Sequence, residues 1–175
     1  MYSRILVPVD GSEASFGALN EAVQLAKEQG GELRLLHIVK APMLDYGFSA
    51  DDSSRQDIIA ALSKIGKSIL ANANATVREQ GLAPECLLIE SVAGSAAAVI
   101  LAQARQWPAD LIVMGSHPRG GPRAVGSDTA EVLSGSPIPV LLVRGIAGPA
   151  GQAARSPAEH RALDYASAFP LAAGV

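Results

Sequence analysis

The chain has 175 residues, of which 49% are apolar and 18% are charged, and its formal net charge is −3. This composition fits one globular domain with length to spare at one end, and it excludes an intrinsically disordered chain. A nucleic-acid surface is disfavoured because such surfaces neutralise many phosphates with clustered Lys and Arg side chains. No apolar run reaches the roughly 18 residues that a membrane span needs, so we expect no membrane contact.

The first residues enter strand-like sequence directly, without the basic and apolar segments of a secretory signal, and we therefore expect a cytoplasmic protein. The single cysteine, Cys86, excludes an intrachain disulfide and cannot assemble a cysteine-based metal cluster. We expect Cys86 to be a small buried residue at the start of a strand.

Five short apolar runs bounded by turn residues predict β-strands, and their Val, Ile and Leu content is typical of strands buried on both faces. Helical spacings of three and four residues separate the runs, as in the segment from Ser95 to Gln106. This alternation predicts βαβ units and an open α/β fold with a five-stranded parallel sheet and helices on both faces. The predicted strands are Ile5–Val9, Leu33–Val39, Cys86–Ile89, Leu111–Met114 and Val140–Val143.

Two segments fall outside this pattern. Ala41–Ser54 is polar and acidic, and we expect it to form a loop over the carboxyl edge of the sheet. The tail, Gly145–Val175, takes 17 of its 31 residues from Ala, Gly and Pro, so we expect most of it to be disordered or loosely docked. A capping-box start at Ser156 predicts a short helix over 157–168, which could dock on a partner or a second copy of the chain.

Candidate ligand-binding residues follow the first strand, since ligands of open α/β sheets bind at the carboxyl ends of the strands. Asp10 ends this strand, Gly11 turns the chain and Ser12 can cap the next helix. The Asp10 carboxylate could accept from a ribose hydroxyl or hold a hydrated Mg²⁺; it could equally satisfy only the amides of the turn. The residues alone leave both roles open.

A second group of candidates follows the fourth strand. The loop Gly115–Gly121 offers backbone amides for an anion, with His117 and Arg119 nearby, and a helix beginning at Gly126 and Ser127 adds positive potential. Neither a Gly-Lys-Ser/Thr phosphate loop nor a G-x-G-x-x-G turn after the first strand is present. Spacing alone therefore leaves a phosphate-binding loop and an ordinary surface loop both open.

Several stretches together carry a resemblance over Met1–Arg144: "RILVPVDGSEAS", "LRLLHIV", "ADLIVMGSH", Gly126–Ser127 and "SPIPVLLVR". Their order and spacing resemble those of the universal stress protein family. The resemblance implies a flavodoxin-like (Rossmann-like) sheet of order 3-2-1-4-5 within a domain over residues 1–144, and usually a homodimer formed through the last strand, Pro139–Val143. An apolar edge strand suits that pairing, because it would otherwise be open to aggregation.

The family includes members that bind ATP and members that do not, and the binders carry Gly, two residues, Gly, nine residues, then Gly-Ser or Gly-Thr. This chain matches at Gly115, but Pro118 replaces the second glycine and only seven residues separate it from Gly126. Proline removes one amide donor, whereas Gly120 and Gly121 can re-route others at little steric cost. We therefore expect a weakened or altered nucleotide site.

Position by position, the resemblance assigns three groups of residues to a nucleotide. Pro8, Val9 and Asp10 would line the adenosine side and Ile38 would contact the adenine; Gly115, Ser116, His117, Arg119, Gly120 and Gly121 would approach the phosphates; Gly126, Ser127 and Asp128 would complete the cradle. The Asp128 carboxylate suits the start of a helix, yet it would repel a triphosphate unless Mg²⁺ lay between them.

These observations favour a cytoplasmic, homodimeric stress-response protein that binds ATP or AMP, with Mg²⁺ as a further candidate ligand, and acts as a regulatory module rather than an enzyme. Two alternatives stay open: a member that works through protein partners without nucleotide, and a slow Mg²⁺-dependent ATPase. The residues near the loop show no spacing of a catalytic triad. A receiver-like phosphorylation switch is disfavoured, because Asp10 has no second acid beside it.

Overall fold

The computed structural model describes residues 1–40, 52–91, 94–116 and 126–144. Strands and helices alternate along these residues, as the apolar runs predict. The elements are β1 (Arg4–Pro8), α1 (Glu13–Gln29), β2 (Glu32–Lys40), α2 (Asp52–Glu79), β3 (Glu85–Ser91), α3 (Ala96–Gln106), β4 (Leu111–Ser116), α4 (Ser127–Gly135) and β5 (Val140–Arg144).

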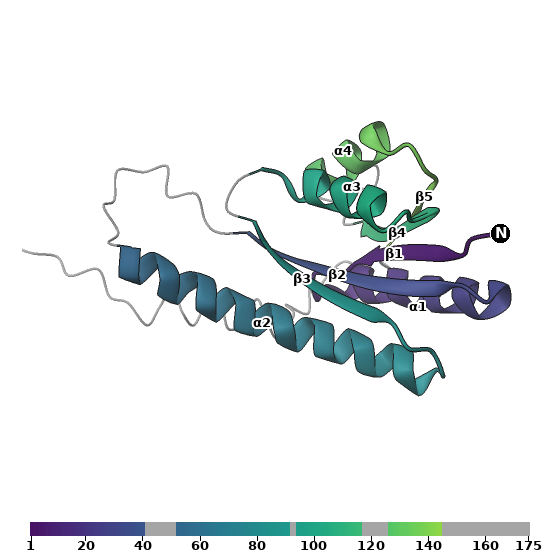
Figure 1. The fold of residues 1–175 in the computed structure, drawn as a ribbon, viewed down its shortest axis with the longest axis horizontal. Helices are drawn as coiled ribbons and strands as arrows, with labels where there is room; N and C mark the ends of the chain where they lie inside the picture. The colour runs from purple at the N-terminus through teal and green to yellow at the C-terminus, as the bar shows by residue number, and fades with distance from the viewer. Residues whose placement is uncertain (41–51, 92–93, 117–125, 145–175) are drawn as a thin grey trace, which may run out of the picture.

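The five strands form one parallel sheet in the order β3-β2-β1-β4-β5, which confirms the predicted fold class and strand order. Helices α1 and α2 cover one face of the sheet, and α3 and α4 cover the other (Figure 1). Successive side chains of β1 point to opposite faces of the sheet: Ile5 and Val7 pack against α1, and Leu6 packs with residues of α3 and α4. All three are fully buried, so β1 is the centre of both cores.

The edge strands differ from the prediction of burial on both faces. Most side chains of β3 and β5 are only half-buried, and Leu141 of β5 is 38% exposed. Cys86 lies at the start of β3, as predicted, but its side chain is exposed rather than buried. An apolar run in the sequence does not reveal whether its strand will lie at the centre or at the edge of the sheet.

Partial burial raises the pKa of the Cys86 thiol, and the negative charge of Glu85 adds to this effect while Arg78 opposes it. A raised pKa lowers the thiolate fraction at neutral pH, so the thiol is a poorer nucleophile than a free cysteine. Its exposure therefore does not by itself make Cys86 reactive.

The predicted loop over Ala41–Ser54 is too long at its C-terminal end, because α2 already begins at Asp52. Helix α2 therefore starts upstream of its first apolar residues. Residues 41–51 and the tail, including the helix predicted over 157–168, lie outside the described residues. Of the helices that the structure describes, none combines the length and the apolar character needed to cross a bilayer.

Candidate functional site

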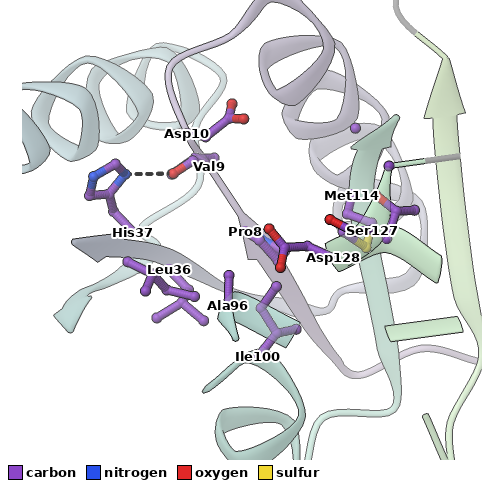
Figure 2. Close-up of a pocket in the computed structure, with 14 residues that line it drawn as sticks. Pro8, Val9, Asp10, Leu36, His37, Ala96, Ile100, Met114, Ser127 and Asp128 are labelled. Carbon is purple, nitrogen blue, oxygen red and sulfur yellow. Dashed lines mark hydrogen bonds between the residues drawn. The ribbon is translucent and has the colours of Figure 1, made fainter. Parts of the chain in front are cut away.

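A cavity of about 370 Å³ lies at the carboxyl ends of β1, β2 and β4. This is the edge of an open α/β sheet where ligands bind, next to the point between β1 and β4 at which the strand order reverses. Figure 2 shows the side chains that surround it. They are Pro8, Val9, Asp10, Leu36, His37, Ile38, Ala96, Ile100, Met114, Gly115, Gly126, Ser127, Asp128 and Thr129.

The turn after β1 places Asp10 at this cavity. Gly11 adopts φ +84°, a left-handed conformation that favours glycine, and this turn leads directly into α1. Ser12 caps α1 by accepting from the Ser15 amide over 3.1 Å. One oxygen of the Asp10 carboxylate accepts from the Ser12 amide at 2.9 Å and from the Ser12 hydroxyl at 2.5 Å. Asp10 therefore accepts hydrogen bonds within the turn and also lines the cavity.

His37 fixes the backbone beside Asp10. Its Nδ1–H donates to the Val9 carbonyl oxygen over 2.7 Å (Figure 2). The Val9 amide in turn donates to the Leu36 carbonyl over 2.8 Å. The ring is pressed against α2, where a Cβ added at Gly66 would come within 2.6 Å of it. These hydrogen bonds connect the end of β1 to β2 and fix the position of the backbone next to Asp10.

The opposite part of the cavity is apolar. Leu36 and Ile38 lie two positions apart on β2 and therefore share one face of the sheet, and Ala96 and Ile100 lie one turn apart on α3. In Figure 2 the side chains of Leu36, Ala96 and Ile100 gather at one side of the view, away from the Asp10 carboxylate. A flat apolar group such as a nucleobase suits this wall, whereas a charged group would lose its hydration there.

The N-terminus of α4 forms the third part of the cavity. Its N-cap is Gly126, which has no side chain to cap the first amides, and Asp128 lies in the first turn. The Asp128 carboxylate forms an ion pair with Lys40, at the end of β2, with Nζ and Oδ2 3.0 Å apart. An uncapped helix start favours an anion, because its amides and its dipole both present positive charge.

Eight of the residues predicted from the sequence line this one cavity: Pro8, Val9, Asp10, Ile38, Gly115, Gly126, Ser127 and Asp128. Ser116 is buried and is not among the lining residues. His117, Arg119, Gly120 and Gly121 lie outside the described residues, as does Pro118. The structure thus brings together the predicted residues of four separate chain segments.

Of the apolar wall, sequence reasoning identified Ile38 but missed Leu36, Ala96 and Ile100, and it also missed the ion pair. The i, i+2 spacing of Leu36 and Ile38 and the i, i+4 spacing of Ala96 and Ile100 are visible in the sequence, but neither spacing states which residues face a cavity. Nothing in the sequence pairs Lys40 with Asp128. Over the described ranges, no three His, Cys, Asp or Glu side chains gather as they would to hold a metal ion.

A sequence model of the universal stress protein family matches residues 1–144. The chain belongs to this family. The universal stress protein YxiE of Bacillus subtilis is 34% identical over 151 residues, which cover 82% of this chain and all of that protein. Among solved structures, the universal stress protein UspA of Lactobacillus plantarum is 31% identical, with a TM-score of 0.68 over 82% of this chain and 98% of that one.

A third relative was solved with a nucleotide bound. The universal stress protein of Archaeoglobus fulgidus in complex with dAMP is 25% identical to this chain, with a TM-score of 0.57 over 81% of this chain and 98% of that one. The family therefore includes a protein of the same fold that binds an adenine nucleotide.

Proposed function

We propose that this universal stress protein is a cytoplasmic regulatory module that binds an adenine nucleotide, AMP or ATP, in the cavity at the carboxyl edge of its sheet. The observation that carries the proposal is the composition of the cavity. One wall is apolar, a carboxylate stands at the end of β1, and a helix begins at Gly126 without a side-chain cap. These three features match the base, the ribose and the phosphate of a nucleotide.

Each part of the nucleotide has a proposed place. The adenine packs between Ile38 and the α3 residues Ala96 and Ile100, the ribose hydroxyls donate to Asp10, and a phosphate accepts from the first amides of α4. A volume near 370 Å³ is within the usual range of small-molecule sites. The Archaeoglobus fulgidus relative and its dAMP support this choice of ligand.

Mg²⁺ is part of the proposal only as a companion of the phosphates. The lining supplies two carboxylates, Asp10 and Asp128, and Mg²⁺ is commonly held by one or two carboxylates together with phosphate oxygens. Both carboxylates already have partners, Ser12 and Lys40 respectively. A cation would therefore have to share or displace these contacts.

Calorimetric titration tests the nucleotide proposal, after a denaturing extract of the purified protein has been checked for bound nucleotide. We expect AMP to bind nucleotide-free protein with a dissociation constant in the micromolar range, about −8 kcal/mol. GMP serves as the control ligand, because it differs only in the base that meets the apolar wall. A flat titration with AMP and with ATP would contradict the proposal and favour the alternative of a family member that works through protein partners.

We also propose that two copies of the chain pair through β5. The supporting observations are that β5 is an edge strand, bonded to β4 alone among the described strands, and that Leu141 is exposed. An apolar edge strand invites pairing with another strand. Residues 145–175 are proposed to be an appendage to the domain over residues 1–144.

Replacing Leu141 by Asp is expected to convert the dimer into a monomer of 18.0 kDa, since the substitution places a charge in the proposed interface. Sedimentation equilibrium measures the change in mass. Leu133→Asp is the matched control, because Leu133 is a similarly exposed leucine, 42% accessible, on α4. A wild-type protein that sediments as a monomer at all concentrations would contradict the proposed interface.

A further inference from the structure

The N-terminal half of α2 presents apolar side chains to solvent. Ile58 and Ile65 are 40% and 45% exposed, and Leu62, which lies between them, is only partly buried. Spacings of four and three residues place these three side chains on one side of the helix. Figure 1 shows that this half of α2 extends past the start of α1. Large exposed apolar side chains grouped on one helix face are typical of a surface that another element covers.

The same row of side chains ends beside the start of α1. Ile69 continues the spacing by four residues and packs against the core. A Cβ added at Gly11, which lies just before α1, would come within 3.0 Å of the Ile69 side chain. We call the row Ile58, Leu62, Ile65 and Ile69 the α2 stripe. It therefore lies on the side of α2 that faces the start of α1, and its exposed part continues beyond that point.

The C-terminal tail leaves the domain on the other side of the same helix. Arg144, the last described residue, pairs with Ser116 at the carboxyl end of β4. Val143 packs against α1, where a Cβ added at Gly17 would meet it at 3.7 Å. A path from Arg144 to the α2 stripe thus has to pass only the first turns of α1. The twelve residues 145–156 can span up to roughly 40 Å, against a helix diameter of about 10 to 12 Å.

The sequence of the tail matches the spacing of the α2 stripe. Its predicted helix, 157–168, and the residue that follows carry apolar side chains four, three and four positions apart, as the stripe does. Helices with this repeat pack side by side with interlocking side chains. A helix of this length is marginal in water by itself, so it needs a surface on which to pack. The apolar positions of the tail are Ala158, Ala162, Tyr165 and Phe169.

We propose that residues 157–168 form an amphipathic helix that packs on the α2 stripe of the same chain. The helix covers the exposed side chains of Ile58 and Ile65 with those of Tyr165 and its apolar neighbours, and the gain comes from removing both surfaces from water. The proposal is independent of nucleotide binding, since none of the four residues of the stripe lines the cavity.

Limited trypsin digestion of the full-length protein tests this proposal, with the first products measured by mass spectrometry. Within 145–175, trypsin can cleave after Arg155, ahead of the predicted helix, and after Arg161, inside it. Cleavage inside the helix follows the population of the undocked tail, so we expect Arg161 to be cut about tenfold more slowly than Arg155. This protection should be the same at a tenfold lower protein concentration, because the contact lies within one chain.

Two variants, each with a matched control, locate the contact. Ile65→Asp places a charge in the stripe and is expected to remove the protection of Arg161, whereas Ala75→Asp, at an exposed position in the C-terminal half of α2, keeps it. Tyr165→Asp is likewise expected to remove the protection from the side of the tail. Its control is Ser167→Asp, on the opposite side of the predicted helix. Thermal melts check that each variant is folded.

Three outcomes would overturn the proposal. Equal cleavage after Arg155 and Arg161 in wild type would show that the tail is not docked. Protection that persists in Ile65→Asp would show that the tail docks elsewhere than on the stripe. Protection that is lost on dilution would place the helix on a second copy of the chain.

Discussion

Replacing Gly115 by Ala is expected to destabilise the protein by about 2 to 3 kcal/mol, as measured by urea denaturation. A Cβ at this position would come within 2.5 Å of the backbone carbon and oxygen of Ala14 and within 2.7 Å of the Ser15 amide nitrogen. These are backbone atoms of α1, so a side-chain rotation cannot relieve the contact. The helix would have to move away from β4, which would disturb the packing of the core around Val113.

The control for Gly115→Ala is Gly17→Ala, a substitution in the interior of α1. A Cβ there meets only Val143 at 3.7 Å, an ordinary contact, and alanine has the higher helix propensity. Gly17→Ala is therefore expected to leave stability unchanged or raise it by up to about 1 kcal/mol. Equal stability of the two variants would show that α1 and β4 are not in such close contact.

Filling the apolar wall is expected to have the largest effect on ligand binding. Ala96 is the first residue of α3 and lines the cavity, so Ala96→Phe places an aromatic ring where the base is proposed to pack. We expect the affinity for AMP to fall at least about a hundredfold, corresponding to about 2.7 kcal/mol. Calorimetric titration measures the loss, and a thermal melt confirms that the variant is folded.

Ala98→Phe is the matched control, because Ala98 lies two residues further along the same helix with an exposed side chain. The same change of residue there leaves the cavity open and is expected to leave AMP binding unchanged. If Ala96→Phe bound AMP as tightly as wild type, the base would not occupy the wall formed by β2 and α3.

The fold was largely predictable because its signals are local. The central strands β1 and β4 are built on the continuous apolar runs Ile5–Val7 and Leu111–Met114, and the helices between the strands show regular spacing. The exposure of Cys86 was not predictable, because strand position within a sheet depends on pairings between distant segments. The early start of α2 at Asp52 was missed because polar residues at a helix start resemble those of a loop.

The candidate site was predictable only in part, for the same reason. Asp10 and Gly126 follow strands or precede helices, where sequence patterns indicate turns and caps. The ion pair between Lys40 and Asp128 spans 88 positions and depends on how β2 and α4 meet in space. The cavity-facing side of α3 likewise depends on the rotation of the helix, which an Ala-rich segment leaves undetermined.

The most direct test of the account is an NMR titration of nucleotide-free, ¹⁵N-labelled protein with AMP. The account predicts that the largest amide shifts cluster at the carboxyl edge of the sheet, at Val9, Asp10, Ile38, Ser127, Asp128 and Thr129. Amides at the opposite edge, such as those of Glu32 and Asp110, are expected to remain unchanged. Saturating AMP without shifts at these cavity residues, or with shifts confined to another surface such as β5, would contradict the assignment of this cavity as the nucleotide site.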